Sequence, residues 1–135
     1  MLARSLAALL AVASGCGGSD GACEVDSDCG GSNVCARNTE CLPAADVRSI
    51  RVTWTIRGQP ASEAVCAPTP NFYLFFAGTQ MGDTFGFSPV PCKAGLFSID
   101  KIPRRFVSVE IGVENGFSDV KAFDANGNAA FDLLL

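Results

Sequence analysis

The cysteines of this chain constrain its fold more than any other feature. The 135 residues include seven cysteines, so at least one of them has no partner within the chain. Cys23, Cys29, Cys35 and Cys41 are each separated by five residues, in a segment, "CEVDSDCGGSNVCARNTEC", whose only large apolar side chains are two valines. So little apolar surface cannot offset the entropy lost on folding, and covalent cross-links must hold the segment. The sequence predicts two disulfides here and leaves three connectivities open.

The first apolar run of the chain ends at Cys16. Residues 1–15, "MLARSLAALLAVASG", carry one positive charge, an apolar run and then small residues. This pattern predicts a secretory signal peptide, because a membrane span needs about twenty apolar residues. The tetrapeptide "ASGC" resembles the lipobox of bacterial lipoproteins, and the resemblance implies cleavage before Cys16 and acylation of that cysteine, for example with palmitate. The alternative is an ordinary signal peptide with Cys16 in a disulfide.

Lipidation of Cys16 would leave six cysteines, an even number that can pair completely in an oxidising compartment. We therefore expect an outer-membrane lipoprotein of the cell envelope that faces the periplasm or the cell surface. Its partner would be the membrane, to which the lipid anchor attaches it. Residues 16–22 would form the lipidated cysteine and a flexible tether, since glycine and serine disfavour regular structure.

The cysteine-rich segment, residues 23–43, resembles the small repeats of the Dickkopf N-terminal and EB-module type. A zinc site would favour C-x-x-C pairs or histidines, and the segment has neither. Glu24, Asp26 and Asp28 alternate as in a calcium loop, but Arg37 stands where an EF-hand needs its bidentate glutamate. We therefore predict structural disulfides, with no metal and no cofactor.

A different composition begins after residue 46. "SIRVTWTIR", residues 49–57, alternates apolar and polar side chains as a half-buried strand does. Further short segments of strand character follow: "NFYLFFAG", "DTFGFS", "GLFSI", "RFVSVEIGVENG", "FSDVKAF" and "NAAFDLLL". The predicted fold class is all-β, with residues 47–135 forming a small disulfide-stapled β-sandwich of about seven strands, preceded by the disulfide-rich mini-segment.

Two turn signals and two cysteines add detail to this sandwich. Asn115-Gly116 and Asn126-Gly127 are dipeptides favoured in tight hairpins, so we expect the last three strands to form an antiparallel meander. Cys66 and Cys92 are predicted to pair with each other, which would stabilise the domain by about 3 to 4 kcal/mol.

The stretch "CKAGLFSIDKIPRRFVSVEIGVENG" resembles the signature of transthyretin-like, carboxypeptidase-regulatory and Cna-B-type sandwiches. Arg105 departs from that signature, which has glycine before the aromatic residue. Cna-B domains often carry a Lys–Asn isopeptide bond, but the first strand here has no lysine, so we infer that a Cys66–Cys92 disulfide replaces it. The resemblance implies a spacer or a binding module.

Charge and composition bear on function. A net charge of −4 and a pI near 4.6 argue against a nucleic-acid partner, which needs clustered lysine and arginine. The chain has no histidine, and its acidic residues in the sandwich are scattered singly, so we expect no catalytic residues and no enzyme activity.

The leading functional hypothesis is a non-catalytic, membrane-anchored scaffold or interaction module with a protein or glycan partner. One alternative is a glycan- or peptide-binding module that uses Tyr73 and Phe75, because their strand turns these two side chains away from its more apolar face. Another alternative is a secreted protease inhibitor, for which "ARNTE" would be the exposed loop.

Overall fold

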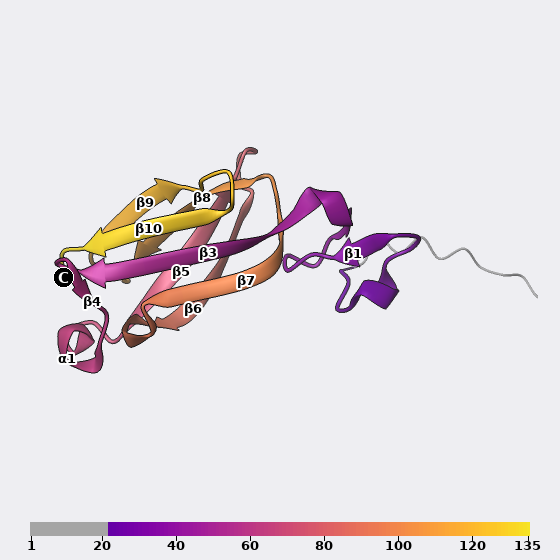
Figure 1. Ribbon diagram of the computed structural model, residues 1–135. Helices are drawn as coiled ribbons and strands as arrows, with labels where there is room; N and C mark the ends of the chain where they lie inside the picture. The colour runs from indigo at the N-terminus through magenta and orange to yellow at the C-terminus, as the bar shows by residue number, and fades with distance from the viewer. Residues whose placement is uncertain (1–21) are drawn as a thin grey trace, which may run out of the picture.

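A computed structural model describes residues 22–135 as a small disulfide-bonded segment beside a β-sandwich (Figure 1). The expected signal peptide, Cys16 and all but the last residue of the expected tether lie outside the described residues. We call the first part, residues 23–46, the repeat, and the second part, residues 47–135, the sandwich.

The repeat is built around two disulfides. It consists of four short elements: η1 (Asp26–Asp28), β1 (Asn33–Cys35), β2 (Cys41–Pro43) and η2 (Ala44–Asp46). Strands β1 and β2 pair antiparallel. One disulfide joins Cys23 to Cys35 and the other joins Cys29 to Cys41, so the first cysteine pairs with the third and the second with the fourth. This connectivity is one of the three that the sequence left open.

The sandwich confirms the predicted all-β class. Its elements are β3 (Val47–Ile56), β4 (Gln59–Pro60), α1 (Glu63–Cys66), β5 (Asn71–Gly78), β6 (Thr84–Pro91), η3 (Cys92–Ala94), β7 (Leu96–Pro103), β8 (Phe106–Gly112), β9 (Ser118–Ala122) and β10 (Asn128–Leu133). One sheet has the order β10-β3-β4, with β7 also paired to β3, and the other has the order β6-β5-β8-β9. The seven predicted strands are all present, and β4 is a two-residue addition.

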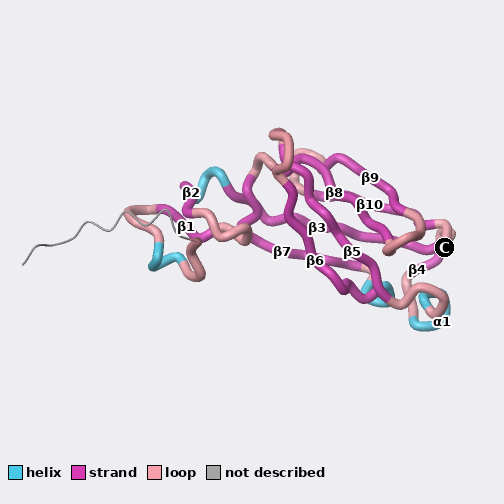
Figure 2. Tube along the Cα trace, turned by 180° about the vertical axis from the view of Figure 1, so that it is seen from behind, coloured by secondary structure: helices cyan, strands magenta, loops and turns pink. Residues whose placement is uncertain are grey.

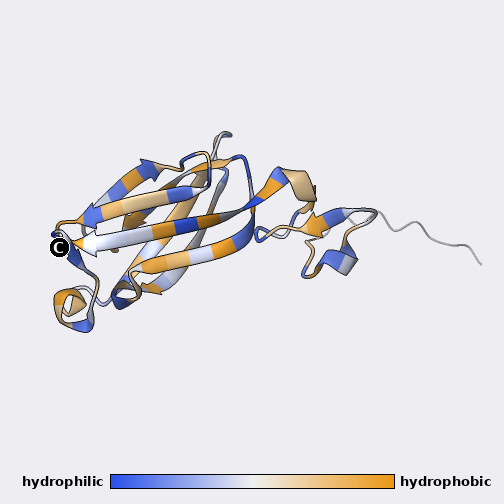
Figure 3. Ribbon diagram, in the orientation of Figure 1, coloured by the Kyte–Doolittle hydropathy of each residue, from blue (hydrophilic) through white to orange (hydrophobic). Residues whose placement is uncertain are grey.

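A single hydrophobic core lies between the two sheets. Hydrophobic and hydrophilic residues alternate along β3, as the coloured ribbon of Figure 3 shows. The buried side chains come from both sheets: Ile50, Val52, Trp54, Ile56, Phe72, Leu74, Phe76, Val109, Ile111, Phe131 and Leu133 are among them. The buried Nε1–H group of Trp54 donates a hydrogen bond to the carbonyl of Cys92 at 2.7 Å, so this polar group of the core has a partner.

The prediction of an antiparallel meander is correct for β8 and β9 and wrong for β10. Strands β8 and β9 are antiparallel neighbours on either side of Asn115-Gly116, as expected. Strand β10 is not the third member, because it pairs parallel with β3 in the opposite sheet, with Asn128 opposite Arg51. The expectation of an antiparallel strand at this position was wrong.

The turn before β10 accounts for this difference. The Asp124 carboxylate accepts hydrogen bonds from the backbone N–H groups of Asn126 and Asn128, both at 2.8 Å. Gly127 has φ of +82°, and its carbonyl accepts a hydrogen bond from the N–H of Arg51 at 2.9 Å. The Asn-Gly turn is therefore closed by an aspartate side chain and attached to β3, and it leads the chain into the other sheet rather than into a hairpin.

The repeat packs against one end of the sandwich, and α1, β4 and the C-terminus lie at the opposite end (Figures 1 and 2). We call that opposite end the distal end. Three ion pairs join the two parts: Lys101 with Asp26 at 2.7 Å, Arg105 with Glu40 at 2.7 Å, and Arg37 with Asp100. The backbone N–H group of Arg37 also donates a hydrogen bond to the backbone carbonyl of Lys101, at 3.0 Å. The repeat is therefore docked on the sandwich by charge and by backbone hydrogen bonding.

Candidate functional site

The structure places Tyr73 and Phe75 on the outer face of the sheet β6-β5-β8-β9. Their neighbours along β5, Phe72, Leu74 and Phe76, are buried in the core, so the alternation of the strand turns Tyr73 and Phe75 outward. Phe75 is 48% exposed, whereas Tyr73 is partly covered. Both residues therefore lie where the sequence pattern predicted.

The two aromatic rings lie side by side. Their centroids are 4.9 Å apart and their planes are inclined by 36°. The Tyr73 hydroxyl donates a hydrogen bond to Oε1 of Glu110 on β8, at 2.8 Å. This hydrogen bond, which only the neutral phenol can donate, raises the pKa of Tyr73 above its usual value. The tyrosine ring is thus fixed by a polar contact at its edge.

A glycine lies beneath each ring. Phe75 is opposite Gly86 on β6, and Tyr73 is opposite Gly112 on β8. A Cβ atom on Gly86 would lie 2.2 Å from Cδ1 of Phe75, and one on Gly112 would lie 2.5 Å from the Tyr73 hydroxyl oxygen. Any larger residue would displace the rings, so the two glycines allow them to lie close against the sheet. We call Tyr73, Phe75 and these two glycines the aromatic platform.

Two surface hollows adjoin the aromatic platform, and Phe75 lines both of them. The first, of about 520 Å³, is also lined by Tyr73, Ser88 and Glu114 among others. The second, of about 380 Å³, is lined by Glu110 and by Val120, which is 58% exposed. In the described part of the chain, each hollow has one glutamate as its only charged lining residue. The aromatic platform therefore has an acidic border.

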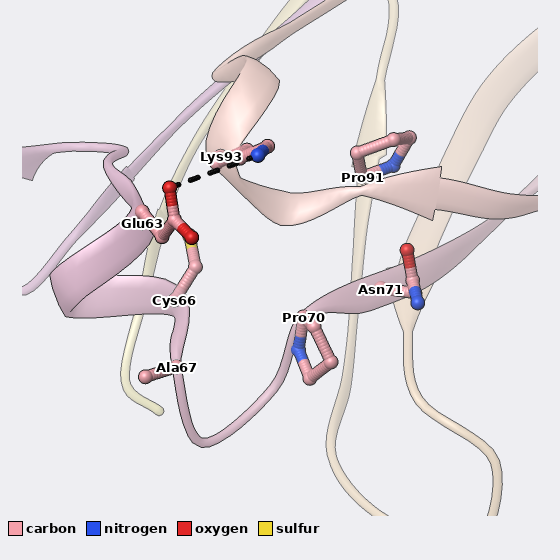
Figure 4. A pocket seen from close by; sticks show the side chains of 7 residues that line it. All are labelled: Glu63, Cys66, Ala67, Pro70, Asn71, Pro91 and Lys93. Atoms are coloured by element: carbon pink, nitrogen blue, oxygen red, sulfur yellow. Dashed lines mark ion pairs between the residues drawn. The ribbon is translucent and has the colours of Figure 1, made fainter.

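A third hollow lies at the distal end (Figure 4). Its volume is about 440 Å³, and Glu63 and Lys93 form an ion pair of 3.8 Å at its border. Pro70 and Pro91 line it as well. Asn71 lines both this hollow and the first hollow beside the aromatic platform, so the two are adjacent.

Three residues of this site were not predicted from the sequence: Glu110, Gly86 and Gly112. The two glycines carried a usable signal, because a glycine inside a strand often marks the close approach of another group. Glu110 looked like an ordinary polar residue of its strand, and only the pairing of β5 with β8 brings it to Tyr73.

The cysteines of the described part of the chain are separate from the aromatic platform. Cys66 and Cys92 form a disulfide at the distal end, which is the pair that the sequence favoured. In the repeat, the sulfur atoms of Cys23, Cys29 and Cys41 lie within 4.8 Å of one another. Each of these three sulfurs belongs to a disulfide, so none is a free thiolate that could bind a metal.

The loop "ARNTE" lies at the docking interface. Arg37 pairs with Asp100, and Glu40 pairs with Arg105. Ala36 is buried at 2% exposure. Arg37, Thr39 and Glu40 are exposed, and the two charged side chains also contact the sandwich through these ion pairs.

Comparisons with protein-family models, with curated proteins and with solved structures found no match to this chain. Within residues 22–135, no helix has both the length and the apolar character needed to cross a membrane.

Proposed function

We propose that this protein is a non-catalytic, lipid-anchored binding module of the bacterial cell envelope, and that the aromatic platform is its binding surface. The proposed anchor is Cys16, supported by the signal-like residues 1–15 and by the lipobox resemblance of "ASGC". The pairing of the six later cysteines among themselves supports this proposal too, because Cys16 is then the unpaired seventh.

The observation that carries the binding proposal is the exposure of Phe75 beside Tyr73. An antiparallel sheet with one solvated face ordinarily presents polar side chains on that face. Here a phenylalanine is 48% exposed on a central strand, held over a glycine and next to a second ring. Amphipathic and aromatic side chains of this kind supply much of the contact energy in binding sites.

The repeat would act as a spacer between the anchor and the sandwich. Its two disulfides and its three ion pairs with the sandwich support a fixed orientation. The resemblance of the sandwich to transthyretin-like and Cna-B-type domains, which implies a spacer or a binding module, agrees with this proposal.

Two further observations support a role without catalysis. The chain has no histidine, the side chain most suited to proton transfer near neutral pH. Glu110, the carboxylate nearest the aromatic rings, accepts a hydrogen bond from Tyr73, which orients that ring. We assign it a positioning role on the platform.

The test is co-sedimentation with bacterial cell envelopes. The envelopes would first be extracted with detergent to remove their lipids. The acyl chains of the protein would then stay in detergent micelles, so the lipid anchor could not cause sedimentation. We expect the purified full-length lipoprotein to sediment with the extracted envelopes, and Phe75→Ala to remain in solution. Met81→Ala is the matched control, because Met81 is fully exposed in the loop between β5 and β6, away from the aromatic platform. Equal sedimentation of wild type and Phe75→Ala would contradict the proposal.

A further inference from the structure

The two rings of the aromatic platform lie on a central strand of their sheet, and Gly86 lies on the neighbouring edge strand, β6. Strand β5, which carries Tyr73 and Phe75, is hydrogen-bonded to β6 on one side and to β8 on the other. Its backbone groups are therefore already paired, and a peptide cannot bind here by adding a strand. A ligand that covers Tyr73 and Phe75 must therefore contact their side chains, because it cannot pair with the backbone of β5.

The side chains available suit a sugar ring. The C–H groups of a pyranose form an apolar face that packs on an aromatic ring, and its hydroxyl groups need hydrogen-bond partners around the edge of that ring. The exposed face of Phe75 supplies the apolar contact. Asn71, Ser88 and Glu114 line one adjacent hollow, and Ser108 and Glu110 line the other, so polar groups lie on both sides of the ring.

The arrangement of the two hollows favours a chain over a single sugar. Phe75 lines the hollow of about 520 Å³ and the hollow of about 380 Å³, so it lies at their common border. A linear oligosaccharide that crosses Phe75 would place one sugar unit on the ring and its neighbours in the two hollows. A monosaccharide would occupy only one of these positions.

The charge of the site limits which glycan can bind. Among residues 22–135, Glu114 is the only charged residue that lines the first hollow, and Glu110 is the only one that lines the second. No described lysine or arginine lines either hollow, so the two carboxylates would repel a carboxylated or sulfated sugar, whereas they can accept hydrogen bonds from hydroxyl or ammonium groups. We infer that the aromatic platform binds a linear glycan that carries no negative charge, neutral or amino-bearing, which crosses Phe75 along the sheet face. This inference rests on the proposed binding function of the same surface.

The first test separates a glycan from a protein ligand on the extracted envelopes. One sample is treated with anhydrous trifluoromethanesulfonic acid, which cleaves glycosidic bonds and leaves peptide bonds intact, and another with proteinase K, which is then inactivated. We expect Phe75-dependent sedimentation to survive proteinase K and to be lost after the acid treatment. The reverse pattern would overturn the glycan inference and would leave the proposed binding function intact, since a Phe75-dependent protein ligand would then exist.

The second test uses defined probes with the full-length lipoprotein in detergent, by isothermal titration calorimetry. The probes are hexamers of N-acetylglucosamine, of glucosamine and of galacturonic acid, which are neutral, cationic and anionic. We expect binding of at least one of the first two, no binding of the third, and a loss of about tenfold or more in Phe75→Ala. Phe75→Leu keeps an apolar side chain over Gly86 without a flat ring, so its affinity should fall as well while its unfolding midpoint stays near that of wild type. Preference for the anionic hexamer, or undiminished affinity in both Phe75 variants, would overturn the inference.

Discussion

The Nζ atom of Lys101 lies 2.7 Å from each carboxylate oxygen of Asp26, and this contact joins strand β7 of the sandwich to helix η1 of the repeat. Lys101 has φ of +54°, so the chain bends at this residue as its side chain meets the repeat. The carbonyl of Lys101 also accepts a hydrogen bond from the backbone N–H group of Arg37. One residue thus contributes both an ion pair and a backbone hydrogen bond to the docking of the two parts.

Replacing Lys101 with methionine should loosen this docking without unfolding either part. The ion pair is lost, while the three disulfides and the core are untouched. We expect the Arg37 amide to exchange its hydrogen several-fold faster, measured by hydrogen–deuterium exchange, with the thermal transition of the sandwich nearly unchanged. Lys93→Met is the control, because Lys93 pairs with Glu63 at the distal end and its loss should not affect exchange at Arg37. Unchanged exchange in Lys101→Met would show that the ion pair does not hold the repeat.

Acid should weaken the docking for the same reason. The hydrogen bond from Lys101 lowers the pKa of Asp26, the hydrogen bond from Arg37 lowers the pKa of Asp100, and the hydrogen bond from Arg105 lowers the pKa of Glu40. A carboxyl group whose pKa is lowered by folding stabilises the folded state at pH values above its unfolded pKa, and this stabilisation is lost as the pH falls through the folded value. We therefore expect docking to be complete at neutral pH, to weaken as the pH falls below the ordinary values of 3.8 for the two aspartates and 4.5 for Glu40, and to be lost as the pH falls through the lower folded values.

Nuclear magnetic resonance titration of the carboxyl carbons checks this pH dependence. The Asp26 midpoint should lie below 3.8, the ordinary value, and should rise toward it in Lys101→Met. Protection of the Arg37 amide should decrease over the same pH range as Asp26 becomes protonated. A midpoint at or above 3.8 in the wild-type protein would contradict the assigned contact.

The Cys66–Cys92 disulfide should be a major source of stability for the sandwich. It links residues 26 apart in sequence and ties helix α1 to η3 at the distal end. The double substitution Cys66→Ala and Cys92→Ala should lower the free energy of unfolding by about 3 to 4 kcal/mol, measured by urea denaturation. The matched control is Cys23→Ala with Cys35→Ala, which should leave the sandwich transition in place. A loss of under about 1 kcal/mol in the first variant would contradict the expected role.

Gly86→Ala should disturb the aromatic platform. The added Cβ atom would lie 2.2 Å from Cδ1 of Phe75 and 2.6 Å from the Leu74 carbonyl oxygen, so the ring must move and the strands must shift slightly. We expect a loss of about 1 to 3 kcal/mol in stability, part of which Phe75→Ala should restore in the double variant. Gly30→Ala is the control, because a Cβ atom there has nothing within 4 Å. Strict additivity of Gly86→Ala and Phe75→Ala would show that the ring does not rest on this glycine.

The sequence predicted those features of the fold that depend on local patterns. Alternation located β3, and a short apolar run located β5. The outward direction of Tyr73 and Phe75 was predicted correctly, because side chains on a strand point to opposite faces in turn. Even cysteine counts in the two parts favoured the Cys66–Cys92 pair. These inferences need no knowledge of how distant segments meet.

Features that depend on distant contacts were not predictable in the same way. The parallel pairing of β10 with β3 depends on the hydrogen bonds of Asp124 and on the contact of Gly127 with Arg51 across the domain. Strict alternation along β8 would bury Val107, yet Val107 is 42% exposed and Phe106 is buried. A register shift between β5 and β8 causes this change, and a single strand carries no signal for it.

The central claim is that a lipid-anchored module with three disulfides presents the aromatic platform outside the cytoplasm. The intact mass of the membrane-extracted protein tests the lipid anchor and the disulfides most directly. The protein would be treated with a thiol-alkylating reagent without any reductant and then measured by mass spectrometry. We predict a chain that begins at Cys16, carries the mass of acyl chains on that residue and shows no alkylated cysteine. A chain without acyl mass, or one with alkylated cysteines among the six that form disulfides here, would contradict the account.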